Sequence, residues 1–154
     1  MRRLGIFTAI LALGVFYTQC GSRGGASGKL KPSYLDKIVL SQMEFVNNSG
    51  QPWDNDGSGP DIRIGLYHPE TQVEEFITTT FFNVKAADLP KEWSISAKRL
   101  QMFDKNWRLV LYDQDDEIRQ VMHAWDFTPS LEDNTITLEG RDNTVYVVLL
   151  EFKR

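Results

Sequence analysis

The sequence predicts an all-β fold, a single eight-stranded antiparallel β-sandwich that follows an N-terminal signal segment. From Asp36 onward, apolar residues alternate with polar ones or form short runs, which is the periodicity of strands. Asn, Asp, Gly, Pro and Ser separate these runs at short, fairly regular spacing, as in sandwiches and barrels. The 154 residues suit one domain, and a closed barrel is the alternative architecture.

The first 19 residues have the layout of a secretory signal peptide. Arg2 and Arg3 precede the uncharged apolar run Leu4–Tyr17, which is the order found in exported proteins. A helix of this length reaches about 21 Å, whereas a bilayer core is roughly 30 Å thick. A signal peptide is therefore favoured over an uncleaved anchor.

The only cysteine of the chain, Cys20, lies directly after this run. The segment around it resembles the lipobox of bacterial lipoproteins: Thr18 and Gly21 fit that pattern, while Tyr17 and Gln19 depart from it. The resemblance implies that Cys20 becomes a lipidated N-terminus, anchored in a membrane of the bacterial cell envelope on the exported side. Two acyl chains suffice for stable anchoring. The alternative is an ordinary signal peptide cleaved near an unrelated cysteine.

The composition of the chain indicates where the folded domain begins and which classes of protein are excluded. Residues 20–28 are rich in Gly and Ser and predict a flexible tether, which leaves residues 29–154 for the sandwich. The chain has 17 basic and 21 acidic residues, a net charge of −4, so a nucleic-acid partner is not expected. One cysteine excludes an internal disulfide, a four-cysteine zinc site and a CxxC pair. His68 and His123 are the only histidines, and no nucleophile–base pair or phosphate-binding motif is evident, so we expect no enzyme.

The expected strands follow from alternation. Ile62, Ile64 and Leu66 share one face of their segment, which predicts a half-buried strand. The last segment is apolar on both faces, as expected of a central strand. Short helical turns are possible only at 86–89 and 115–123. The eight expected strands are Lys37–Val46, Asp61–His68, Val73–Thr80, Trp93–Leu100, Asn106–Asp113, Ile118–Trp125, Thr135–Gly140 and Thr144–Phe152.

The first of two acidic loops precedes the expected strand Asp61–His68. Asp54, Asp56 and Asp61 lie within nine residues, and carboxylates held close together repel one another unless a cation with oxygen ligands lies between them. An EF-hand is excluded, because the twelfth position counted from Asp54 is Gly65 rather than glutamate. The alternative is an ordinary surface turn rich in Asn, Asp, Gly and Ser.

The second acidic loop follows the strand that contains Trp107. The stretch Trp107–Tyr112 runs directly into Asp113, Asp115 and Asp116. In an Asp-x-Asp sequence that continues a strand, both side chains lie on the same side of the chain. We therefore expect them to share an ion with the first loop at one end of the sandwich.

Together, the two loops and the strand pattern resemble a C2 domain, the calcium- and phospholipid-binding β-sandwich family. The resemblance covers most of residues 34–154, but its specific motifs are only the two loops. The family places an acid where Asn55 stands, between Asp54 and Asp56, and a third acid in the second loop at Asp116 or Glu117 only if that loop is shorter. It implies a calcium site formed by six residues: Asp54, Asp56, Asp61, Asp113, Asp115 and Asp116.

These observations predict a non-catalytic, membrane-anchored envelope lipoprotein whose C2-like domain binds calcium. Its expected partners are the membrane, through Cys20, and a phospholipid, a glycan or an envelope protein. The alternatives are a metal-free interaction or structural module of the cell envelope, and an enzyme or carbohydrate-binding domain with an unrecognised site.

Overall fold

The computed structural model describes residues 34–68, 70–103, 105–116, 118–141 and 144–153. The expected signal peptide (residues 1–19), the lipid anchor Cys20, the tether (20–28) and Glu117 lie outside the described residues. Among the described residues, no helix is long and apolar enough to cross a membrane.

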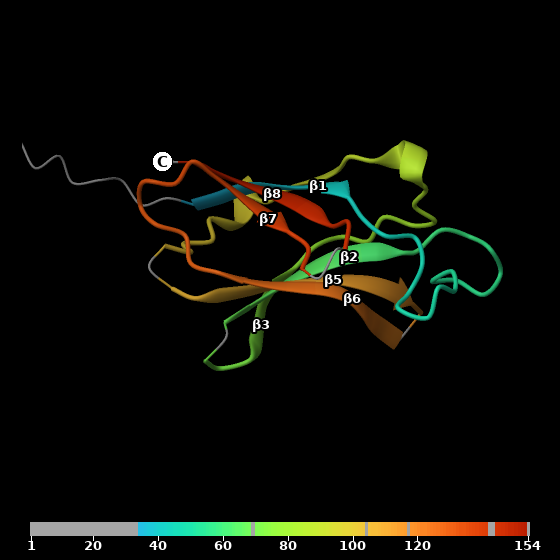
Figure 1. The fold of residues 1–154 in the computed structure, drawn as a ribbon. Helices are drawn as coiled ribbons and strands as arrows, with labels where there is room; N and C mark the ends of the chain where they lie inside the picture. The colour runs from blue at the N-terminus through green and yellow to red at the C-terminus, as the bar shows by residue number, and fades with distance from the viewer. Residues whose placement is uncertain (1–33, 69, 104, 117, 142–143, 154) are drawn as a thin grey trace, which may run out of the picture.

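The described chain forms two four-stranded antiparallel sheets packed face to face (Figure 1). One sheet has the strand order β4-β1-β8-β7 and the other β3-β2-β5-β6. This confirms the predicted eight-stranded sandwich over the barrel. The strands are β1 (Tyr34–Gln42), β2 (Ile62–His68), β3 (Val73–Ile77), β4 (Lys91–Ser94), β5 (Trp107–Asp115), β6 (Ile118–Phe127), β7 (Thr135–Glu139) and β8 (Val147–Lys153).

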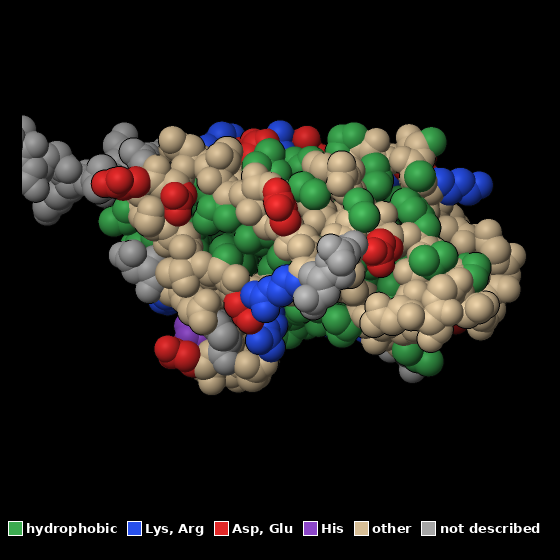
Figure 2. All heavy atoms as spheres, viewed as in Figure 1, with side chains coloured by type: hydrophobic (Ala, Val, Ile, Leu, Met, Phe, Trp, Pro, Cys, Tyr) green, Lys and Arg blue, Asp and Glu red, His purple; other side chains and the backbone are tan. Residues whose placement is uncertain are grey.

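The core lies between the inner faces of the two sheets. Ile62, Ile64 and Leu66 of β2 are fully buried, as are Leu109 and Leu111 of β5. Their partners across the core include Ile38 of β1 and Leu150 of β8, which are also fully buried. Figure 2 shows charged side chains scattered among apolar ones on one outer face. The period of two residues in the sequence therefore identified the inward faces.

β8 has the central position that its apolar sequence predicts, between β1 and β7. Its inward residues Val148, Leu150 and Phe152 are buried, while Val147 and Leu149 on the other face are half-buried. A central strand covered fully on only one face explains this difference.

Several expected segments differ from the observed ones. The strand expected at Lys37–Val46 is observed at Tyr34–Gln42, and the strand expected at Thr144–Phe152 begins only at Val147. The strand expected at Trp93–Leu100 ends at Ser94, because residues Ser96–Lys98 form a short 3₁₀ helix and Arg99 has a left-handed backbone (φ 48°). The strand expected to reach Thr80 ends at Ile77. Residues 86–88 form a single 3₁₀ turn, whereas most of 115–123 belongs to the β5–β6 hairpin.

The register between β2 and β5 brings the two acidic loops together. Ile62 at the start of β2 lies opposite Asp113 near the end of β5. Because the strands are antiparallel, the chain entering β2 and the chain leaving β5 emerge at the same end of the sheet. The backbone N–H of Gln114 donates to the carbonyl of Asp61 at 2.8 Å and joins the two loops at this end.

Candidate metal centre

Three segments meet at this end of the sandwich: residues 53–61, residues 113–116 and residues 81–84. The third segment is bound to the first by backbone hydrogen bonds. Ile62 and Phe81 exchange N–H···O bonds of 2.8 and 2.9 Å, and the N–H of Val84 donates to the carbonyl of Pro60 at 3.0 Å. This places Asn83 beside the two predicted acidic loops.

Two glycines of the first loop allow this path for different reasons. Gly57 has a left-handed backbone (φ 79°), which glycine adopts without steric cost. Gly59 has no such φ value, but a Cβ atom there would collide with the carbonyl of Val84. From the sequence, both glycines were expected to let the backbone turn sharply. In the structure, Gly59 is needed instead because its backbone lies against that of Val84.

Asp54, Asp113 and Asp115 form a cluster, and one carboxylate oxygen from each lies within 4.8 Å of the others. This cluster can hold a metal ion. Asp54 and Asp115 line an open hollow of about 400 Å³, whereas the buried Asp113 is not among its lining residues. The other three predicted acids, Asp56, Asp61 and Asp116, line the same hollow. The remaining residues that line the hollow are Asn55, Ser58 and Asn83.

Asp113 differs from Asp54 and Asp115 in that it is fully buried. Its Oδ1 accepts the backbone N–H of Asp61 at 2.8 Å, whereas its buried Oδ2 has no hydrogen-bond partner among the described residues. Burial, and then the negative charges of Asp115, Asp54 and Asp61, raise the pKa of Asp113 to about 6. A buried carboxylate oxygen without a partner destabilises the fold, so this atom marks a position where a cation would be stabilised.

Asp54 and Asp115 complete the cluster from opposite loops. Burial and the neighbouring Asp54 carboxylate raise the pKa of Asp115, which accepts a hydrogen bond from Gln120 Nε2 at 3.4 Å. The hydroxyl of Ser58 donates to Asp54 Oδ2 at 2.9 Å. Two carboxylates this close favour either a shared proton or a bound cation.

Asp56 and Asp61 also stabilise the loops. Asp56 Oδ1 accepts the backbone N–H of Ser58 at 2.8 Å, and hydrogen bonding to Ser58 lowers the Asp56 pKa. Asp61 Oδ1 accepts the backbone N–H of Asn83 at 2.8 Å. These two carboxylates therefore hold the first and third segments in shape around the cluster, in addition to lining the hollow.

Asn83 was not identified from the sequence. It lies 22 residues after Asp61, in a segment without acidic neighbours. Its left-handed backbone (φ 52°) is typical of Asn in turns, but that preference alone does not indicate a ligand. Only the pairing of residues 81–84 with the start of β2 brings its side chain to the hollow.

No protein-family model matches the chain, and no curated protein matches it significantly. The fold and the site define the chain as an all-β sandwich with an aspartate cluster, able to hold a metal ion, at one end.

Proposed function

We propose that this chain is a non-catalytic, membrane-anchored envelope lipoprotein whose C2-like sandwich binds calcium at the aspartate cluster. The observation that carries the calcium site is Asp113, which belongs to the cluster with Asp54 and Asp115 and whose buried Oδ2 lacks a hydrogen-bond partner among the described residues. Ordinary acidic surface turns expose their carboxylates to water and need no cation.

The donor set favours calcium over other common metals. Every ligating side chain near the cluster offers oxygen, and the described residues around the hollow contribute neither histidine nor cysteine. Hard cations prefer oxygen, and calcium accepts six to eight oxygen ligands in flexible geometry. Magnesium requires a tighter octahedron and gives up water reluctantly, so a wide hollow open to solvent suits it less.

The lipoprotein part of the proposal rests on the apolar run Leu4–Tyr17 and on Cys20 directly after it. The C2-like part rests on the eight-stranded sandwich and on two acidic loops that converge at one end. The calcium site would then face a ligand, such as a phospholipid, a glycan or an envelope protein.

Thermal unfolding of the full chain in chelator, in calcium and in magnesium tests the metal site. An ion that binds only the folded state at one hundred times its Kd adds about 2.7 kcal/mol, which raises the Tm of a domain this size by about 5–10 °C. Calcium should produce this shift, and magnesium much less of it.

Asp115→Asn should remove most of the calcium shift, since Asp115 belongs to the cluster. The matched control is Asp88→Asn, at an exposed aspartate whose Oδ2 accepts the N–H of Lys85 outside the hollow; it should keep the shift. Equal small shifts with both cations, unaffected by Asp115→Asn, would contradict the calcium proposal and favour the metal-free interaction module.

A further inference from the structure

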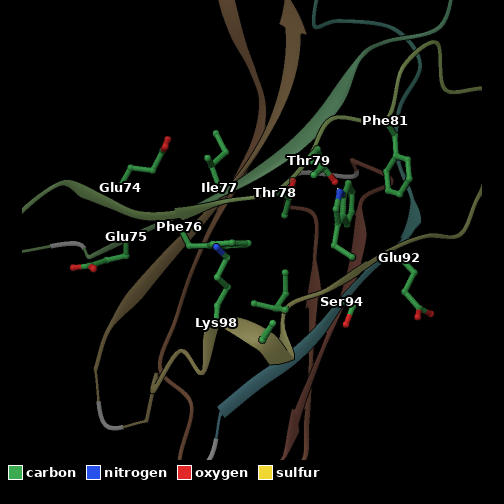
Figure 3. A pocket seen from close by; sticks show the side chains of 13 residues that line it. Glu74, Glu75, Phe76, Ile77, Thr78, Thr79, Phe81, Glu92, Ser94 and Lys98 are labelled. Carbon is green, nitrogen blue, oxygen red and sulfur yellow. The ribbon is translucent and has the colours of Figure 1, made fainter.

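A groove of about 620 Å³ runs between β3 and β4, which are edge strands of the two different sheets (Figure 3). None of the residues that line this groove also lines the hollow around the aspartate cluster. The groove is therefore a separate feature, which neither the core nor the metal centre explains.

The floor of the groove is apolar and rigid. Trp93 of β4 is buried, and its indole N–H donates to the carbonyl of Thr79 at 2.9 Å, which fixes the ring. The Phe81 ring packs against it at 5.0 Å, and Phe76 points from β3 into the groove toward Lys98 (Figure 3). Fixed aromatic rings in a partly enclosed groove are typical of sites that bind apolar side chains.

The sides of the groove offer unpaired backbone. β3 pairs only with β2 and β4 only with β1 among the described strands. An edge strand presents N–H and C=O groups that pair with an added strand, which is how many domains bind extended peptides. An acyl chain or a small apolar molecule would make no use of these groups.

One end of the groove is lined by both acidic and basic side chains. Glu74 already pairs with Arg119, and Glu92 with Lys37. Glu75 is exposed and forms no ion pair with any residue that the structure describes, and the same holds for Lys98. An occupant that carries a basic and an acidic side chain would complement this end.

We propose that the groove binds an extended peptide segment of a partner protein, which adds a strand to the free edge of β3. Alternate apolar side chains of the peptide contact Phe76, Phe81 and Trp93, because every second residue of a strand points to the same face. A basic side chain of the peptide lies near Glu75 and an acidic one near Lys98. Binding is independent of the metal centre.

Selection from a displayed library of random peptides, about eight residues long as in an ordinary strand, tests this proposal on the immobilised full chain. The expected result is enrichment of peptides with alternating apolar residues and charges of both signs, free of proline in the middle. No enrichment, or enrichment of peptides with central prolines, would overturn the proposal, since proline cannot donate to a strand ladder.

Fluorescence anisotropy with one enriched peptide then locates the site. Glu75→Lys should weaken binding about fivefold or more at low salt, and reversing the basic residue of the peptide should restore it. The matched control is Glu139→Lys, at an exposed glutamate on β7, the opposite edge of the β4 sheet; it should change Kd by less than about twofold.

Two further outcomes separate this proposal from others. Chelator should leave peptide binding unchanged, so that loss of the calcium site does not affect this result. Equal binding by the Glu75→Lys and wild-type chains, or a concentration-dependent dimer that Glu75→Lys dissociates and the peptide does not compete with, would contradict the peptide site. The second of these would assign the groove to another copy of this chain.

Discussion

Replacing Asp113 with asparagine should stabilise the metal-free protein and remove its response to calcium. Asp113 is fully buried, its Oδ2 lacks a hydrogen-bond partner among the described residues, and its pKa is raised to about 6 from 3.8. Asparagine keeps an oxygen that can accept the Asp61 N–H and carries no charge beside the carboxylates of Asp54 and Asp115. The substitution therefore removes both the repulsion within the cluster and the desolvation of a buried charge.

The magnitude follows from linkage between protonation and folding. A folded-state pKa of about 6 against 3.8 corresponds to about 3 kcal/mol of destabilisation when Asp113 is fully ionised. Because the folded-state pKa is raised, the stability contributed by the protonated carboxyl is present below pH 3.8 and is lost as the pH rises through about 6. The gain from Asp113→Asn is therefore largest above pH 7, about 1–3 kcal/mol, and decreases toward pH 4.

Urea denaturation of both chains from pH 4 to pH 8, in chelator and in saturating calcium, measures this gain. In calcium the order should reverse, because the wild type gains the binding energy and the variant does not. Asp126→Asn, which weakens the exposed ion pair with Arg108 at 2.8 Å, serves as a control and should lower stability slightly, by about 0–1 kcal/mol, with and without calcium. If Asp113→Asn destabilises the chelated protein at pH 8, or keeps the full calcium response, the reasoning about the buried carboxylate is wrong.

Three other predictions concern the core, the pH response and the anchor. Leu109→Ala should lower the free energy of unfolding by about 2–5 kcal/mol, because Leu109 is fully buried. Val121→Ala, at a side chain 59% exposed, should change it by less than about 0.5 kcal/mol. Urea denaturation compares the two variants, and equal effects would refute the assignment of inward and outward faces. Burial, and then the charge of Arg141, lower the pKa of His123, so its contribution to stability is present above the ordinary value of 6.5 and is lost as the pH falls through the lowered folded-state pKa. The His123→Phe chain should therefore lose less stability than the wild type between pH 7.5 and pH 5, and parallel pH curves would show that His123 titrates as it does when unfolded. Cys20→Ser should move the chain out of the membrane fraction on cell fractionation, since the tether has no apolar stretch to hold it; retention through an uncleaved apolar run would contradict lipid anchoring.

The sequence by itself determined the fold class and the inward faces of the strands. Ile62, Ile64 and Leu66 alternate with polar or small residues, and all three are fully buried in β2. Alternation is a local property, because successive side chains of a strand point to opposite faces. The sequence also placed three aspartates before β2 and three at the end of β5, since the charge density of a loop can be read without knowledge of its neighbours.

Only the tertiary structure decided what these loops do together. The antiparallel register of Ile62 with Asp113 brings both loops to one end, buries Asp113 and brings Asn83 from a third segment. Register depends on pairing between strands distant in sequence, and a shift of one residue would turn each side chain to the other face. The groove between β3 and β4 likewise depends on pairing between distant strands. No local pattern in the sequence predicts which strands lie at the edges of the two sheets, or that these two edges lie next to each other.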